Sequence, residues 1–199
     1  MPLSQALDLI HPRPNRIGEA IEKIQNETQI LFLFPQLLFS RQQQCFKEAI
    51  KTGEIPNKKV KGIVGYGAFS KAFLTSDYKV LKLSTDPLFP SEADFIKDVD
   101  VPIYKSYIAH LNNGEKVYGA LEAFAESAVV RFDLSKLKNI AEYQRNWDIL
   151  NDILWAKTNY EFDYDFGEGI PLFAKQMGFI GDKPYLLDHQ SVLGRPLMT

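Results

Sequence analysis

The chain has little that could build a disulfide scaffold or a stand-alone metal centre. Its single cysteine, Cys45, has no second cysteine with which to form an internal disulfide. The three histidines, His11, His110 and His189, stand far apart and lack the spacing of zinc ligands. We therefore expect no metal cluster that is independent of a nucleotide, and we interpret Cys45 as a buried apolar side chain.

Long hydrophobic runs and an excess of either charge are also missing. The most apolar run, residues 30–39, contains Pro35 and is too short to span a bilayer. The first residues lack the basic stretch and apolar core of a signal peptide. With a net charge of -2, no nucleic-acid or membrane partner is indicated. We expect a cytoplasmic protein with a protein substrate or partner; an effector delivered into a host cell would have the same features.

Three stretches differ in their sequence pattern. Residues 1–58 are predicted to be helical, first around Ile17, Ala20, Ile21 and Ile24 and again over residues 41–51, with Pro35 between and Gly53 as a stop signal. Residues 59–124 carry strand patterns, and residues 125–199 carry a helix followed by a hairpin. We expect an α+β protein made of these three parts.

The middle stretch predicts three strands, a short helix and two further strands. The strands are expected near residues 60–64, 71–75 and 78–83, and the short helix starts at Ser91. A hairpin over residues 103–111 and 116–122 turns at Asn112-Asn113-Gly114.

The last stretch predicts one strong amphipathic helix. Its apolar residues recur at intervals of three and four: Ile140, Tyr143, Trp147, Leu150 and Leu154. Trp147 and Trp155 are both interpreted as core residues. A second hairpin over residues 177–187 ends in Asp188-His189-Gln190.

The chemistry of the middle stretch centres on a glycine-rich turn followed by a lysine. Gly65 and Gly67 allow the backbone to approach a phosphate without a Cβ in between. Successive backbone N–H groups in such a turn form a concavity that binds anions. Lys82 follows on the neighbouring strand as an inward-pointing cation. The simpler alternative is an ordinary β-hairpin with a solvated lysine.

These residues resemble the glycine loop and lysine strand of protein kinases. Gly65 and Gly67 fill the first two glycine positions, Ser70 stands at the third, and Ala72 and Val80 stand where apolar residues contact adenine. The resemblance implies a small antiparallel β N-lobe over residues 59–124 and a reduced, mainly helical C-lobe over residues 125–199. Residues 1–58 form an N-terminal extension. The resemblance also implies that Lys82 pairs with the phosphates of ATP, and that the hinge at Glu122 and Phe124 binds the adenine edge.

The resemblance assigns the acidic residues to magnesium and to the acceptor. Asp188 stands at the position of the D-F-G aspartate that holds Mg²⁺, and Gln176 lies near the position of the magnesium-binding asparagine. No H-R-D triplet is present, and Asp163 and Asp165 are the candidates for the base beside the acceptor hydroxyl.

The resulting expectation is a minimal atypical protein kinase of the bacterial-effector or phage type, which transfers the γ-phosphoryl group of ATP to a protein hydroxyl. Two alternatives stay open. One is a pseudokinase that serves as a protein-binding module, with or without nucleotide. The other is phosphoryl transfer to a small molecule by the same residues.

Overall fold

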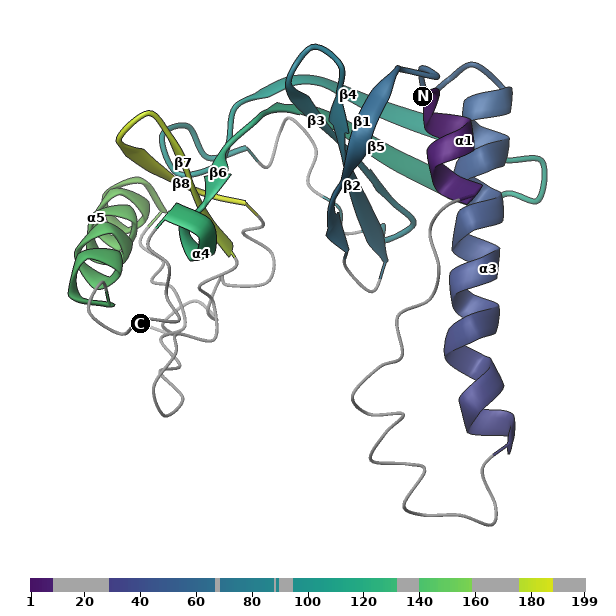
Figure 1. Ribbon diagram of the computed structural model, residues 1–199, viewed down its shortest axis with the longest axis horizontal. Coiled ribbons are helices and arrows are strands. Elements are labelled where there is room, and N and C mark those ends of the chain that lie inside the picture. Colours follow the sequence, from purple (N-terminus) through teal and green to yellow (C-terminus); the bar gives the residue numbers. More distant parts are fainter. Residues whose placement is uncertain are drawn as a thin grey trace. The chain divides into compact units, whose positions relative to one another are not determined.

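The computed structural model describes residues 1–8, 29–66, 69–87, 89, 95–131, 140–158 and 176–187. These residues form an α+β fold with a five-stranded antiparallel sheet, a three-stranded sheet and a few helices (Figure 1). The described residues divide into two compact units, one within Met1–Phe89 and Ser106–Leu121 and the other within Pro90–Lys105 and Glu122–Thr199. The division falls inside the β4 and β5 strands.

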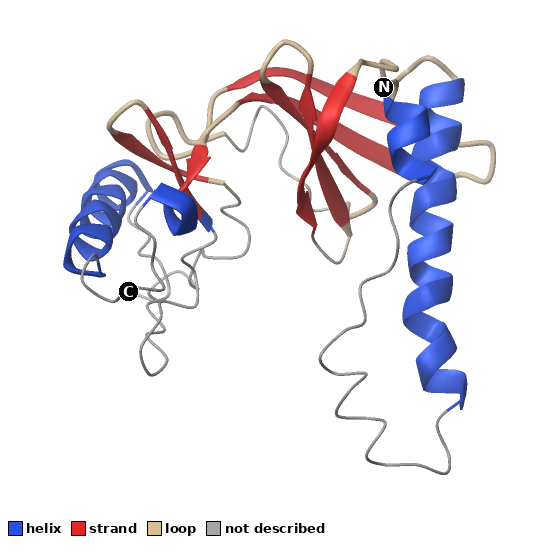
Figure 2. Ribbon diagram, viewed as in Figure 1, coloured by secondary structure: helices blue, strands red, loops and turns tan. Residues whose placement is uncertain are grey.

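The five-stranded sheet has the order β1-β2-β3-β5-β4. Its strands are β1 (Val60–Tyr66), β2 (Ser70–Thr75), β3 (Lys79–Ser84), β4 (Ile103–His110) and β5 (Lys116–Ala123). The predicted strands and the predicted β4–β5 hairpin are all present (Figure 2). Gly114 has a φ of 84° in the turn of this hairpin, a value that favours glycine. Asn113 supports the same turn, because its side-chain oxygen accepts a hydrogen bond from the Glu115 amide at 3.0 Å.

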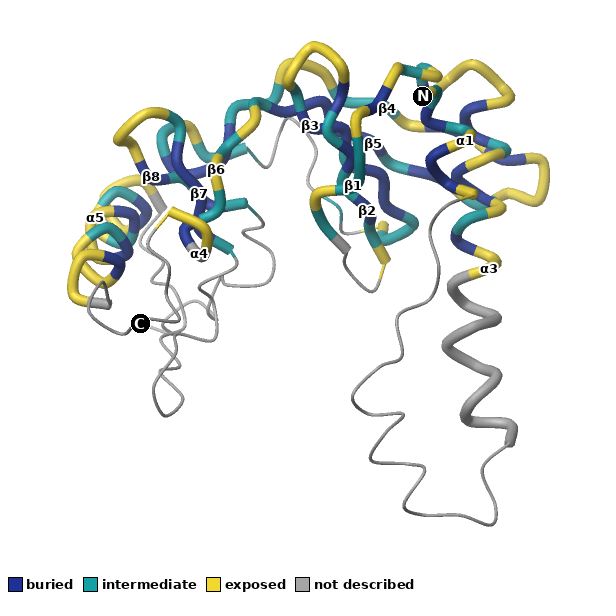
Figure 3. The backbone as a smooth tube through the Cα atoms, in the orientation of Figure 1, coloured by how far each residue is buried: buried dark blue, intermediate teal, exposed yellow. Residues whose placement is uncertain are grey.

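Two N-terminal helices cover one face of this sheet. They are α1 (Leu3–Asp8) and α3 (Gln29–Lys51). Leu3, Ala6 and Leu7 are buried at helical spacing, and the end of α3 buries a second stripe made of Cys45, Phe46, Ala49 and Ile50. Both stripes pack against sheet residues that include Phe73, Leu81, Leu83, Val117 and Leu121. Figure 3 shows the buried parts of α1, α3 and these strands in dark blue. The N-terminal extension is thus part of the core of the first unit.

The helix prediction for this region was wrong at Pro35. The sequence placed a break there, yet α3 runs unbroken from Gln29 to Lys51 through this proline. A proline inside a helix lacks one N–H donor and usually kinks or breaks it, but here the helix continues. The predicted end is confirmed, because α3 stops at Lys51 and Gly53 follows with a φ of 82°. The helix predicted around Ile17–Ile24 lies outside the described residues.

Ion pairs and hydrogen bonds add to this packing. Arg41 of α3 pairs with Glu115 in the β4–β5 hairpin, and Lys47 pairs with Asp8 of α1. The His110 amide donates to Glu54 at 2.6 Å. Exposed pairs of this kind contribute at most about 1 kcal/mol each, so the apolar stripes dominate the docking of the helices.

The second unit has its own core. Its elements are β6 (Glu126–Ser127), α4 (Ala128–Arg131), α5 (Ile140–Thr158), β7 (Met177–Ile180) and β8 (Lys183–Leu186), with the sheet order β6-β7-β8. The predicted stripe of α5 packs against Val99, Met177, Phe179 and Leu186. The predicted hairpin is also present, and Gly181 in its turn has a φ of 63°.

Trp155 is an exception to the core assignment. Trp147 is only 3% exposed, as the sequence predicted, whereas Trp155 is 43% exposed. It directly follows Leu154 of the buried stripe, and one step along an α-helix rotates the side chain by about 100° around the axis. The short helix predicted from Ser91 falls mostly outside the described residues, and residues 95–96 are not helical.

Candidate functional site

Gly65, Ala72 and Lys82 form one row across three neighbouring strands. Gly65 of β1 pairs with Ala72 of β2, and Ala72 pairs with Lys82 of β3. Directly paired residues in an antiparallel sheet place their side chains on the same face. The sequence spacing predicted a lysine near the glycine turn, and the strand register brings the two into line.

This row lies on the face opposite the helical core. Phe73 and Leu81, the next pair along β2 and β3, belong to the core beneath α1 and α3. Because side chains alternate between faces, Ala72 and Lys82 point to the other side. Leu74 and Val80 form the following pair on that side, and Val80 is buried. Three of the proposed nucleotide contacts, Ala72, Val80 and Lys82, therefore share a face with Gly65.

The neighbouring strand crowds position 65. A Cβ atom built on Gly65 would lie 3.3 Å from the Cβ of Ala72, which is tighter than most such contacts. The row is consequently low in side-chain bulk next to the turn, and its one long side chain is Lys82. A flat strip of backbone beside a cation suits an anionic ligand.

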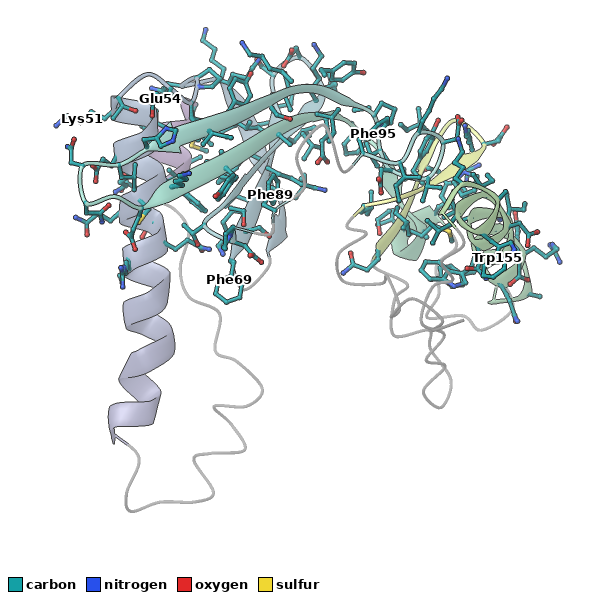
Figure 4. All side chains as sticks on the ribbon, turned by 180° about the vertical axis from the view of Figure 1, so that it is seen from behind. Lys51, Glu54, Phe69, Phe89, Phe95 and Trp155 are labelled. Atoms are coloured by element: carbon teal, nitrogen blue, oxygen red, sulfur yellow. The ribbon has the colours of Figure 1, made fainter. Side chains whose placement is uncertain are left out.

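The hairpin stem next to this row is fastened to β3. The carbonyl oxygen of Phe69 accepts two hydrogen bonds, from the Ser84 hydroxyl at 3.2 Å and from the Thr85 amide at 3.0 Å. The Phe69 side chain is 56% exposed and extends away from the sheet (Figure 4). Ser70, the residue at the third glycine position, begins β2 and is half-buried. Gly67 lies outside the described residues.

Lys71, which the sequence analysis overlooked, is the buried lysine of this sheet region. Lys82, the proposed phosphate partner, is half-buried, whereas Lys71 is 4% exposed on the helical side. Its Nζ donates to the side-chain oxygen of Gln42 at 2.8 Å and to the Ser70 carbonyl at 3.1 Å. Burial lowers the pKa of Lys71 to about 8. The alternation Lys71-Phe73-Thr75 was the signal that could have revealed it.

The hinge residues have mixed surroundings. Glu122 is 6% exposed, and Phe124 is 42% exposed. Between them, the Ala123 amide donates to the Pro102 carbonyl at 2.9 Å. That N–H is therefore engaged within the protein, and an adenine edge would have to use the carbonyl of Glu122 or the backbone of Phe124.

Of the proposed magnesium and acceptor residues, the structure describes only Gln176. It opens the β7–β8 hairpin, where its carbonyl accepts a hydrogen bond from the Leu187 amide at 2.6 Å. Asp163, Asp165 and Asp188 lie outside the described residues. Among the residues that the structure does describe, no three His, Cys, Asp or Glu side chains gather as a metal site.

No protein-family model matches the chain, and no curated protein matches it. Within the described ranges, every helix is too short or too polar to cross a membrane.

Proposed function

We propose that this protein is a kinase-like phosphotransferase, which binds ATP on the first unit and transfers the γ-phosphoryl group to a protein hydroxyl. The observation that carries the proposal is the row Gly65–Ala72–Lys82 on the sheet face opposite the helical core. The order of elements adds support, because three strands and then a two-stranded hairpin also follow one another in the N-lobe of protein kinases.

Each residue of this face has a role in holding the nucleotide. The backbone around Gly65 lies against the phosphates, where a side chain would obstruct the approach. Lys82 neutralises phosphate charge and fixes its position. Ala72 and Val80 provide a small apolar surface for the adenine ring, and the polar contacts to its edge are those that the resemblance assigns to the Glu122–Phe124 backbone. Because such chemistry is largely positioning and electrostatics, a small scaffold can perform it.

The residues proposed to bind magnesium and to act on the acceptor complete the proposal. Asp188 and Gln176 hold Mg²⁺, for which side-chain oxygens are suitable ligands, and Asp163 or Asp165 accepts the proton of the acceptor hydroxyl. Support comes from the β7–β8 hairpin, whose pairing continues to Gln176 and Leu187, the residue before Asp188. ATP, when bound with Mg²⁺, supplies the phosphoryl group that is transferred.

A pseudokinase is the second candidate, and one observation favours it. The Ala123 amide, in the middle of the proposed hinge, already donates to Pro102. This reduces the backbone groups that could recognise adenine. In this alternative the fold serves as a protein-binding module, with or without a nucleotide.

Thermal unfolding with Mg·ATP distinguishes a protein that binds the nucleotide from a nucleotide-free binding module. A ligand held only by the folded state stabilises it by about 2.7 kcal/mol at a hundredfold excess over its Kd, which raises Tm by several degrees. We expect this rise for the wild type and its loss for Lys82→Ala. Lys79→Ala, on the same strand but paired with Asp77 at 3.5 Å, is the matched control and should keep the rise.

Transfer itself is tested with γ-labelled ATP and candidate protein acceptors. Asp188→Asn should abolish labelling, and one of the two variants Asp163→Asn and Asp165→Asn should abolish it as well, which identifies the aspartate that accepts the proton. A wild type whose Tm is unchanged by Mg·ATP contradicts the kinase proposal and leaves the nucleotide-free binding module.

A further inference from the structure

Three consecutive glutamines on α3 have three different environments. Gln42 is 7% exposed, and its side-chain oxygen accepts the hydrogen bond from Lys71 in β2. Gln43 donates its side-chain amide to the Leu7 carbonyl of α1. Gln44 is exposed. One short segment of helix therefore contacts the sheet, the neighbouring helix and the solvent through the same side-chain type.

The contact from Gln42 reaches the base of the glycine hairpin. Lys71 pairs with Tyr66 of β1, the last pair before the turn, and with Leu83 of β3. Lys71 also donates to the Ser70 carbonyl, one residue nearer the turn. Its neighbour Ala72 belongs to the proposed nucleotide face, while Lys71 itself faces α3. Any rotation of β2 about its axis moves both side chains together.

The buried ammonium makes this contact sensitive to small shifts. A charge removed from water is strongly destabilising unless polar groups surround it closely. Hydrogen bonds to charged groups contribute more to stability than those between neutral groups. Gln42 thus constrains Lys71 and, through the backbone, the position of Ala72 and of the hairpin stem.

We propose that Gln42 is a positioning residue for nucleotide binding: α3, through Lys71, sets the position of the β1–β2 hairpin over the opposite face of the sheet. The inference rests on the proposed function. The Gln42–Lys71 hydrogen bond would then connect the N-terminal extension to the nucleotide site, and a change at Gln42 would alter the affinity for the nucleotide.

Calorimetric titration with Mg·ATP, well below Tm, tests the proposal on four variants. Gln42→Leu removes the acceptor and should weaken binding at least about fivefold, the lower range of coupling between sites. Gln42→Glu keeps an oxygen beside Lys71 and should restore the wild-type affinity. Gln43→Leu removes a contact between helices only, and Gln44→Leu changes an exposed residue. Both should bind as the wild type does.

Amide hydrogen exchange of β2 provides a readout that needs no nucleotide. Protection of Ser70–Thr75 should fall in Gln42→Leu and stay unchanged in Gln43→Leu and Gln44→Leu. If the wild type binds no Mg·ATP, the proposed function fails, and the exchange alone decides whether Gln42 positions the hairpin. Equal affinity of Gln42→Leu and the wild type, or equal weakening by Gln43→Leu, overturns the inference.

Discussion

At the scale of single residues, neighbouring side chains of one strand lie in different environments. Lys71 and Ala72 are neighbours in β2, but Lys71 is buried on the side of α3 and Ala72 is half-buried on the opposite side. A buried ammonium is disfavoured relative to the neutral amine, which is why the pKa of Lys71 falls to about 8. The same residue therefore connects the packing of the helix to the pH dependence of stability.

Stability should rise with pH because of Lys71. Its pKa is about 8 in the folded state against 10.5 as the reference, so between these values the unfolded chain binds more protons. The free energy of unfolding should therefore increase as the pH rises above 8, by up to about 3 kcal/mol. Urea unfolding at pH 7 and pH 10 measures this change in the free energy of unfolding. The change should be smaller in Lys71→Met than in the wild type, while Lys82→Met should keep it.

Cys45 should be unreactive in the folded protein. Burial, together with the nearby Glu115 carboxylate, raises its pKa to about 11, so the thiolate is scarce at pH 8. Ellman's reagent should react slowly with the native protein and rapidly in urea. Glu115→Gln replaces the carboxylate, whose oxygen lies 3.4 Å from Sγ, with a neutral amide, and should increase the native rate. Fast labelling of the native wild type would contradict this prediction.

At the scale of elements, close backbone approach decides where a strand tolerates a side chain. Gly178 of β7 lies between β6 and β8, opposite Ser127 and Tyr185. A Cβ there would lie 2.7 Å from Leu187 Cδ2 and 3.1 Å from both Ala125 Cβ and the Glu126 carbonyl oxygen. A side chain at this position would therefore require Leu187 to move and would crowd Ala125 and the Glu126 backbone.

Gly178→Ala should destabilise the protein by about 1–3 kcal/mol, the usual cost of overpacking. Gly62→Ala in β1 is the matched control, because nothing lies within 4 Å of the added methyl group and its φ is not positive. That substitution should be tolerated. Denaturant midpoints of both variants check the difference, and an equal loss in both would argue against steric crowding at Gly178.

At the scale of the whole molecule, the described residues contain two separate cores. One lies between the N-terminal helices and the five-stranded sheet, and the other lies between α5 and the β6-β7-β8 sheet. Each is assembled from segments far apart in the sequence. A mutation in one core should therefore lower the local stability of its own unit more than that of the other unit.

Phe46→Ala and Leu150→Ala should act on different units. Both side chains are fully buried, and such truncations cost about 2–5 kcal/mol. Phe46→Ala should accelerate amide exchange in β2 and β3 and leave α5 protected, while Leu150→Ala should do the reverse. Exchange followed by mass spectrometry distinguishes these outcomes. Uniform acceleration across both units would mean that they unfold as one.

Local patterns in the sequence determined the helix α5, the two hairpins and the strand spacing that aligns Gly65, Ala72 and Lys82. These features depend on periodicity and turn residues within a few positions, which a single sequence contains. The tertiary structure alone decided that α3 continues through Pro35, that Lys71 rather than Lys82 is the buried lysine, and that Trp155 is exposed. Strand alternation tells which residues share a face, but which face is covered depends on segments distant in the chain, here the N-terminal helices, whose apolar stripes remove Lys71 from water.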